Sequence, residues 1–387
     1  MIGTLLFLFA LVCIGHILIG YPVSLRWRRP GPPIRRDPAF TPAVTAVMAV
    51  RNGSHWLEAK LDNLLALDYP PQCFDILVVC NGGELDDSES IARNYAASQP
   101  RIRVLRIPAG GKSSALAAAF PHCTHSEALL MVDVRQQLEP TSLRQLAACL
   151  ADEHVGTVSG ELRIRHAGTQ AEANVGLYWR FEFWLRTKLS HIDSIFGATG
   201  AIYLIRRSLV DSIPANILLD DMFIPLRGFF LGYRLIVEPS AVAWDEPTAG
   251  MVEFRRKVRT LAGNYQLLRH YPQLLNPSAN RLWFDYLSYK LGRLILPHLL
   301  VLLALSSLWL PFPWRLPVVG IQLGGYLLAL IDPLVAEGAT IKRLTSSAHT
   351  FLTMMAAAFC AQIIFFVPAE SLWKPTQTQS TKPDSRS

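Results

Sequence analysis

Residues 43–53, Ala-Val-Thr-Ala-Val-Met-Ala-Val-Arg-Asn-Gly, decide the fold of this chain. The apolar run 43–50 predicts a strand buried on both faces, and Asn-Gly ends it in a tight turn. The same alternation continues downstream, with strands expected at 76–80, 102–107 and 128–132 and helices at 56–67, 89–98 and 113–120. Strands alternating with helices predict an α/β domain with a parallel sheet covered on both faces.

The turns after these strands carry polar and charged residues. Ligands of such sheets bind at the carboxyl ends of the strands, so four consecutive turns predict one pocket for a charged ligand such as a nucleotide. Its predicted donor-binding residues are Arg51, Asn52, Asn81, Lys112, Asp133 and Arg135. Each turn taken alone could be ordinary, because Asn and Gly supply the φ angles that turns need. The sequence has neither G-x-x-x-x-G-K-[ST] nor G-x-G-x-x-G, which argues against an ATPase and a dinucleotide oxidoreductase.

A carboxylate pair, Asp220-Asp221, precedes a basic cluster at 255–259. Transfer of a group from a diphosphate requires a base for the nucleophile and cations for the departing charge. We therefore predict Asp221 as the base, Asp220 as its support, and Arg256 and Arg259 as catalytic cations at the diphosphate. The alternatives are a helix N-cap for Asp221 and attraction to a membrane surface for the basic cluster.

Composition places part of the chain in a membrane. Of its 387 residues 51% are hydrophobic and only 17% are charged. Residues 1–25 read as a transmembrane anchor followed by arginines, which places the N-terminus outside and the next segment in the cytosol. Residues 294–368 contain three more apolar stretches, which we predict to be transmembrane helices, with Lys342-Arg343 between the last two. Residues 369–387 form a polar tail that is expected to be disordered and to lie outside the cytosol. These predictions describe an integral plasma (inner) membrane protein with a cytosolic catalytic domain; buried helices of a soluble core are the alternative.

The segment 40–276 is expected to be the catalytic domain, followed by an interfacial amphipathic helix at 277–293. An aromatic stripe at 177–185 indicates either core packing or a second helix at the membrane surface, close to a lipid-linked acceptor. The net charge of +7 is modest, so membrane lipids and a diphosphate account for it without nucleic acid. The six cysteines show no C-x-x-C spacing, which disfavours a zinc site or a disulfide framework.

The order of these motifs resembles the family 2 glycosyltransferases, in particular membrane-bound members similar to bacterial polysaccharide synthases and ceramide glucosyltransferases. Residues 131–136 stand at the family's Asp-x-Asp position, Leu219-Asp220-Asp221 at its acidic motif, and 256–260 at its arginine element. The resemblance implies a GT-A fold with a Rossmann-like mixed sheet, binding of a nucleotide-sugar donor, and inverting transfer to a membrane-associated acceptor, a glycolipid or a short or exported polysaccharide. It also implies an acceptor loop with Gly197, Thr199 and Gly200, and a divalent cation (Mg or Mn) on Asp133.

Three residues depart from the family pattern. Arg135 replaces the second Asp of Asp-x-Asp, Asn81 replaces an Asp, and Thr260 replaces a Trp. Arg135 leaves two alternatives open: a cation held by Asp133 with another oxygen ligand, or an arginine that supplies part of the cation's charge. The missing Trp disfavours a long polymer as product. A catalytically silent nucleotide-sugar-binding subunit, working with partner proteins of glycan assembly, remains the alternative function.

Overall fold

The computed structural model describes residues 1–82, 86–165, 170–246 and 250–372, with the backbone alone at 170–179 and 250–253. In this part of the chain, eight strands form one mixed sheet in the order β3-β2-β1-β4-β7-β6-β8-β5. The strands are β1 (Val44–Val50), β2 (Phe74–Asn81), β3 (Ile102–Ile107), β4 (Ala128–Val132), β5 (Gln137–Leu138), β6 (Val155–Ile164), β7 (Ile202–Arg206) and β8 (Arg234–Asp245). Strands β1 to β4 are parallel, whereas β7 is antiparallel to both β4 and β6. Strands β6 and β8 are parallel to each other, so the predicted α/β fold with a mixed sheet is confirmed.

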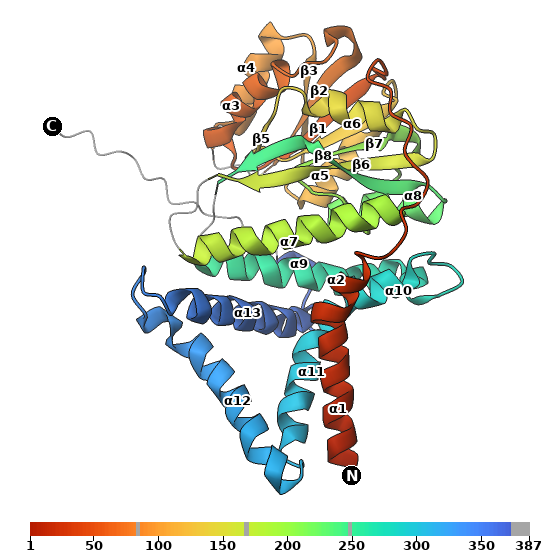
Figure 1. The fold of residues 1–387 in the computed structure, drawn as a ribbon. Helices are drawn as coiled ribbons and strands as arrows, with labels where there is room; N and C mark the ends of the chain where they lie inside the picture. Colours follow the sequence, from red (N-terminus) through yellow and green to blue (C-terminus); the bar gives the residue numbers. More distant parts are fainter. Residues whose placement is uncertain (83–85, 166–169, 247–249, 373–387) are drawn as a thin grey trace, which may run out of the picture.

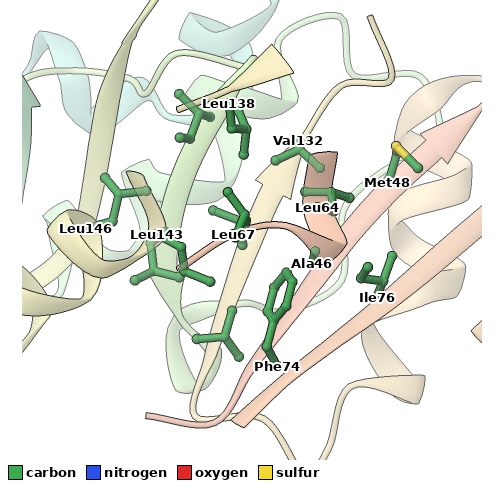
Figure 2. Close-up of a cluster of buried hydrophobic side chains, with 14 of the residues drawn as sticks. Ala46, Met48, Leu64, Leu67, Phe74, Ile76, Val132, Leu138, Leu143 and Leu146 are labelled. Atoms are coloured by element: carbon green, nitrogen blue, oxygen red, sulfur yellow. The ribbon is translucent and has the colours of Figure 1, made fainter. Parts of the chain in front are cut away.

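Helices cover both faces of the sheet. They are α3 (Ser54–Leu65), α4 (Ser88–Ser98), α5 (Lys112–Ala119), α6 (Ser142–Leu150), α7 (Gln170–Ile192), α8 (Asp220–Phe230) and α9 (Gly250–His270). Side chains of β1 alternate between the faces: Ala46 and Met48 join the core beneath α3 and α6, and Val47 joins the core beneath α5. Figure 2 shows the first of these cores, in which Phe74 and Ile76 of β2 lie beside Ala46 and Met48. Burial on both faces explains the nearly continuous apolar strands.

Among the described residues, four helices are long and apolar enough to cross a membrane: Ile2–Ser24, Trp283–Ser307, Phe312–Leu334 and Lys342–Phe365. The first contains α1 (Ile2–Gly15) and α2 (Tyr21–Ser24), and the others contain α10 (Trp283–Asp285), α11 (Gly292–Ser307), α12 (Phe312–Ile331) and α13 (Lys342–Cys360). In Figure 1, α1, α11 and α12 extend away from the sheet, whereas α13 lies across the base of the catalytic domain. Helix α13 packs against α7 and α9 of that domain.

Both ends of the C-terminal helical segment contact the catalytic domain. Leu282, before α10, lies in a core with Phe229 of that domain, and Ala369, after α13, packs with Leu218 and Ala262 of the same domain. A chain that leaves a domain on one side of a membrane and returns to it crosses an even number of times. The three crossings expected after the domain stay a prediction, and these contacts favour two.

The predicted interfacial segment at 277–293 overlaps the start of a long helix. From Trp283 the chain is helical without interruption through a π-helical stretch, Tyr286–Leu291, into α11. Tyr286 and Tyr289 of that stretch are 1% and 2% exposed because they pack into the core that contains Phe196 and Leu189. These two tyrosines therefore anchor a helix that is long and apolar enough to span a membrane against the catalytic domain.

Candidate active site

The donor edge of the site begins at a loop between β3 and α5. Asn81, at the end of β2, holds this loop from both sides: its Nδ2 donates to the carbonyl of Gly110, and Gly110 N donates to its Oδ1 at 2.8 Å. The loop leads into Lys112, the first residue of α5. Asn81 thus orders the loop that places the lysine, and its direct contact with a donor stays a prediction.

Lys112 brings two carboxylates together. Its Nζ lies 2.8 Å from Oδ1 of Asp133, after β4, and 3.0 Å from Oδ2 of Asp220, at the start of α8. Burial opposes the lysine's charge, but Asp133 and Asp220 together hold the pKa of Lys112 above its ordinary value. A phosphate oxygen of a ligand can form a charge-assisted hydrogen bond with this buried ammonium if it displaces one of the two carboxylates. The structure therefore unites three predicted residues that are far apart in sequence.

Asp221 lies beside this cluster with a different environment. Burial and then the neighbouring Asp220 raise the pKa of Asp221 to about 6, although Lys112 acts in the opposite direction. Its backbone carbonyl accepts a hydrogen bond from Ala198 N at 2.8 Å, which joins α8 to the loop at 197–200. A carboxylate with a pKa near neutrality is suited to accept a proton in catalysis. Asp220 is thus paired with Lys112 while Asp221 faces the loop at 197–200, and their roles as support and base stay predictions.

Helix α9 approaches the acidic pair closely. Gln266 accepts a hydrogen bond from Leu218 N and donates to the carbonyl of Asn216, which fixes the segment before Asp220. A Cβ atom on Gly263 would lie 2.5 Å from Cγ of Leu219, so only glycine permits this approach. The basic residues of α9 are placed by this contact. Burial lowers the pKa of Arg259, and the charges of Asp220 and Asp133 act against that shift, so the guanidinium lies near the carboxylate cluster.

The sequence did not reveal Arg186 as a site residue. From α7 it donates to Oγ1 of Thr199 at 2.6 Å, to the carbonyl of Gly197 at 3.1 Å, and to Oγ of Ser159 at 2.9 Å. Ser159 in turn accepts a hydrogen bond from Thr199 N. Arg186 therefore holds the predicted acceptor loop by two direct hydrogen bonds and by a third through Ser159. Its position within an amphipathic helix resembled that of any solvated arginine, so the sequence gave no specific signal.

The loop itself lies against the proposed base. A Cβ atom placed on Gly200 would be 3.3 Å from Oδ2 of Asp221, and Gly197 lines a cavity of about 440 Å³ that also has Asp221 in its wall. Arg51 does not line this cavity. It lines a second cavity, together with Gly110, Gly111 and Glu370. Asn52 has a φ angle of 52°, in the left-handed region, which is typical of a turn residue such as the one after β1.

The residues at the Asp-x-Asp position take part in ion pairs within the protein. Asp133 is paired with Lys112, and Nη2 of Arg135 lies 2.5 Å from Oδ2 of the buried Asp245. In the described part of the chain no group of three or more metal-ligating side chains is found. Lys60, which the sequence did not single out, donates to the carbonyl of Gln136, and burial lowers its pKa to about 7. Cations of the protein therefore occupy the surroundings of Asp133.

Comparison with known proteins agrees with this geometry. A curated relative, described as probable glycosyltransferase YdaM of Bacillus subtilis (strain 168), is 26% identical to this chain over 281 residues. The match covers 69% of this chain and 66% of the relative, which is just under two thirds of the relative's length. The solved structure of the mannosyltransferase PcManGT from Pyrobaculum calidifontis, in complex with GDP-Man and Mn²⁺, superimposes with a TM-score of 0.70 at 22% identity. It covers 92% of this chain and 98% of that one, which establishes the GT-A-type fold. Residues 42–262 match the model of the family described as glycosyltransferase like family 2, and the chain therefore belongs to the family 2 glycosyltransferases.

Proposed function

We propose that the protein is an inverting glycosyltransferase that moves a sugar from a nucleotide-sugar to a hydroxyl of a membrane-associated acceptor. The observation that carries the proposal is the position of Asp221. It lines the cavity that reaches the apolar helices, and it lies beside Asp220, which Lys112 joins to Asp133. The location of Asp221 between a charged cluster that suits the donor and a cavity that suits the acceptor supports its assignment as the base.

The proposed reaction assigns one task to each part of the site. Asp221 accepts the proton of an acceptor hydroxyl while that oxygen forms a bond to the anomeric carbon of the donor sugar. The bond between this carbon and the diphosphate oxygen breaks, and the electron pair leaves with the nucleoside diphosphate. Lys112, Arg256 and Arg259 stabilise the negative charge that develops on the leaving group. A single displacement of this kind inverts the configuration of the sugar.

The membrane arrangement supports an acceptor that arrives from the lipid phase. We infer that α1, α11 and α12 cross an inner membrane and that α13 lies at its surface, beneath α7 and α9. With the catalytic domain in the cytosol, the arginines after α2 and Lys342 at the start of α13 lie on the cytosolic side, in agreement with the positive-inside rule. The N-terminus is then outside, and residues 369–372 are on the cytosolic side.

The test is sugar transfer by the purified full chain in lipid nanodiscs, supplied with a panel of labelled nucleotide-sugars and membrane lipid extract. We expect one donor to be consumed by the natural chain and turnover to fall at least about a thousandfold in Asp221→Asn. Turnover unchanged by Asp221→Asn would overturn the assignment of the base. Nucleotide binding without turnover of any donor would support the rival function, a catalytically silent partner subunit, for which the replacement of Asp by Arg135 is the specific observation.

A further inference from the structure

The cavity next to Asp221 has walls of two chemical kinds. Its apolar wall comes from helices of the membrane-proximal part, including Leu18, Leu296 of α11, and Phe351, Met354 and Met355 of α13. Its volume of about 440 Å³ falls in the range of small-molecule sites and accommodates a lipid head group with the first part of its chain. Methionine side chains adapt to flexible apolar ligands. The cavity is therefore suited to an amphiphile.

The polar wall of the same cavity carries an excess of positive charge. Its cations are Arg186, Lys257, Lys290 and Arg293, and its carboxylates are Glu182 and Asp221. Four cations against two carboxylates leave an excess of two charges. Nη1 of Arg293 is 2.5 Å from Oε2 of Glu182, so this pair is internally neutralised. Positive charge in a largely apolar cavity is costly unless an anion accompanies it.

Lys290 lies close to an aromatic ring and has no carboxylate partner in the part of the chain that the structure describes. Its Nζ lies 4.8 Å from the ring centre of Tyr289. Glu182, an acidic residue of the same wall, is occupied by Arg293 and by the hydroxyl of Tyr289. The Lys290 ammonium is thus available to an anionic group of a ligand, at a membrane-proximal position and in the same cavity as Asp221.

We propose that the acceptor is a lipid that carries a phosphate and a free hydroxyl in its head group. This inference rests on the proposed function and specifies its acceptor. The phosphate is bound at Lys290, the hydroxyl faces Asp221, and the chain runs along Phe351 and Met354 of α13. The oxygen of that hydroxyl forms the new bond to the sugar and gives its proton to Asp221, and the phosphate of the lipid stays intact.

The donor's diphosphate does not account for Lys290. The donor edge is defined by Lys112 with Asp133 and by the cavity at Arg51 and Gly110. Lys290 lies in the π-helical stretch that leads into α11, and it lines only the cavity that contains the α13 side chains among the cavities described. A variant of Lys290 should consequently affect the acceptor and leave the donor unaffected.

The test separates the natural membrane lipids into neutral and anionic fractions by anion exchange. Each fraction is incorporated in phosphatidylcholine nanodiscs with the full chain and the labelled donor. We expect label to enter lipid only with the anionic fraction, in a product that still binds the exchanger. The anionic acceptor could be a phospholipid or a lipid-linked sugar phosphate, and mild alkaline deacylation of the product distinguishes them. An ester-linked phospholipid loses its chains under these conditions, whereas a lipid-linked sugar phosphate keeps its chain. Transfer to neutral lipid alone would overturn the proposal, whereas absence of transfer to any fraction contradicts the proposed function itself.

Variants locate the phosphate. Lys290→Gln should raise the KM for the anionic lipid about tenfold, with the KM for the donor changed less than twofold, because a charge-assisted hydrogen bond is lost. Lys290→Arg, which keeps the charge, should retain most of the affinity. Lys188→Gln on α7 is the matched control, because Lys188 does not line the cavity. Equal acceptor KM values for Lys290→Gln and Lys188→Gln, in protein of unchanged melting temperature, would contradict the assignment.

Discussion

The guanidinium of Arg135 donates from Nη2 to Oδ2 of Asp245 across 2.5 Å. Asp245 is 4% exposed and accepts a second hydrogen bond from Nε2 of Gln136 at 3.0 Å. The residue that stands where the family has its second Asp is thus committed to a buried ion pair. The sequence left two alternatives, a cation held by Asp133 with another oxygen ligand and an arginine that supplies part of the cation's charge. Arg135 is engaged by Asp245, and both alternatives stay predictions.

We expect donor turnover to survive chelation. The proposal assigns the stabilisation of the departing diphosphate to the charges of Lys112, Arg256 and Arg259, so added EDTA should lower the initial rate by less than about tenfold. The rate is measured in nanodiscs before and after chelation and again after Mn²⁺ is restored. Complete loss with EDTA and recovery with Mn²⁺ would show that Asp133 and the phosphates suffice to hold a cation.

The Arg135–Asp245 pair should contribute to folding. Arg135→Ala leaves a buried carboxylate without its cation and should lower the free energy of unfolding by about 3 kcal/mol. Arg163→Ala removes an arginine that is 46% exposed and pairs with Glu161, so it should cost less than about 1 kcal/mol. Denaturant titration of both variants in the same detergent measures the difference, and equal costs would show that the buried pair is not stabilising.

The rate should depend on the ionisation of Asp221. Its pKa is raised to about 6, so the active, deprotonated form is lost as the pH falls through this value. We expect kcat to fall tenfold per pH unit below about 6 and to be level just above it. Because the folded state favours the protonated carboxyl, Asp221→Asn removes an unfavourable charge at pH 7 and should not lower the melting temperature. An acidic limb centred near pH 4 would contradict the raised pKa.

Gly200 should be sensitive to a single added carbon. A Cβ atom there would lie 3.3 Å from Oδ2 of Asp221, which is tighter than ordinary contact, so the carboxylate must shift. Gly200→Ala should reduce kcat about tenfold because small displacements of a catalytic group are costly. Gly324→Ala in α12 meets no atom within 4 Å and serves as control. Comparable kcat values for the two variants would show that Asp221 tolerates the shift.

The termini should lie on opposite sides of the membrane. With α1, α11 and α12 crossing, a green fluorescent protein at the C-terminus should fluoresce in the cytosol, and alkaline phosphatase fused there should be inactive. A phosphatase at the N-terminus, introduced with its own export signal, should be active. Active phosphatase at the C-terminus would show that α13 also crosses the membrane, as a third crossing after the catalytic domain.

Much of the candidate site could be read from sequence because its residues follow strand ends. The turns after β2, β3 and β4 carry Asn81, Lys112 and Asp133, and parallel strands bring their carboxyl ends to one edge whatever the packing details. The roles of individual side chains were less predictable. Asn81 and Arg135 have partners, Gly110 and Asp245, that are 29 and 110 positions away, and such pairings depend on the register of the whole sheet.

The sequence by itself determined the α/β domain, its place between apolar helices, and the acidic and basic motifs, because strand periodicity and turn chemistry are local properties. Only the tertiary structure decided that α13 returns to the domain, that Arg186 holds the acceptor loop, and that Lys290 shares a cavity with Asp221. These relationships depend on helix packing across the membrane-proximal face. An apolar helix that spans a bilayer and one that packs against a domain can have the same composition, so the contacts decide between them.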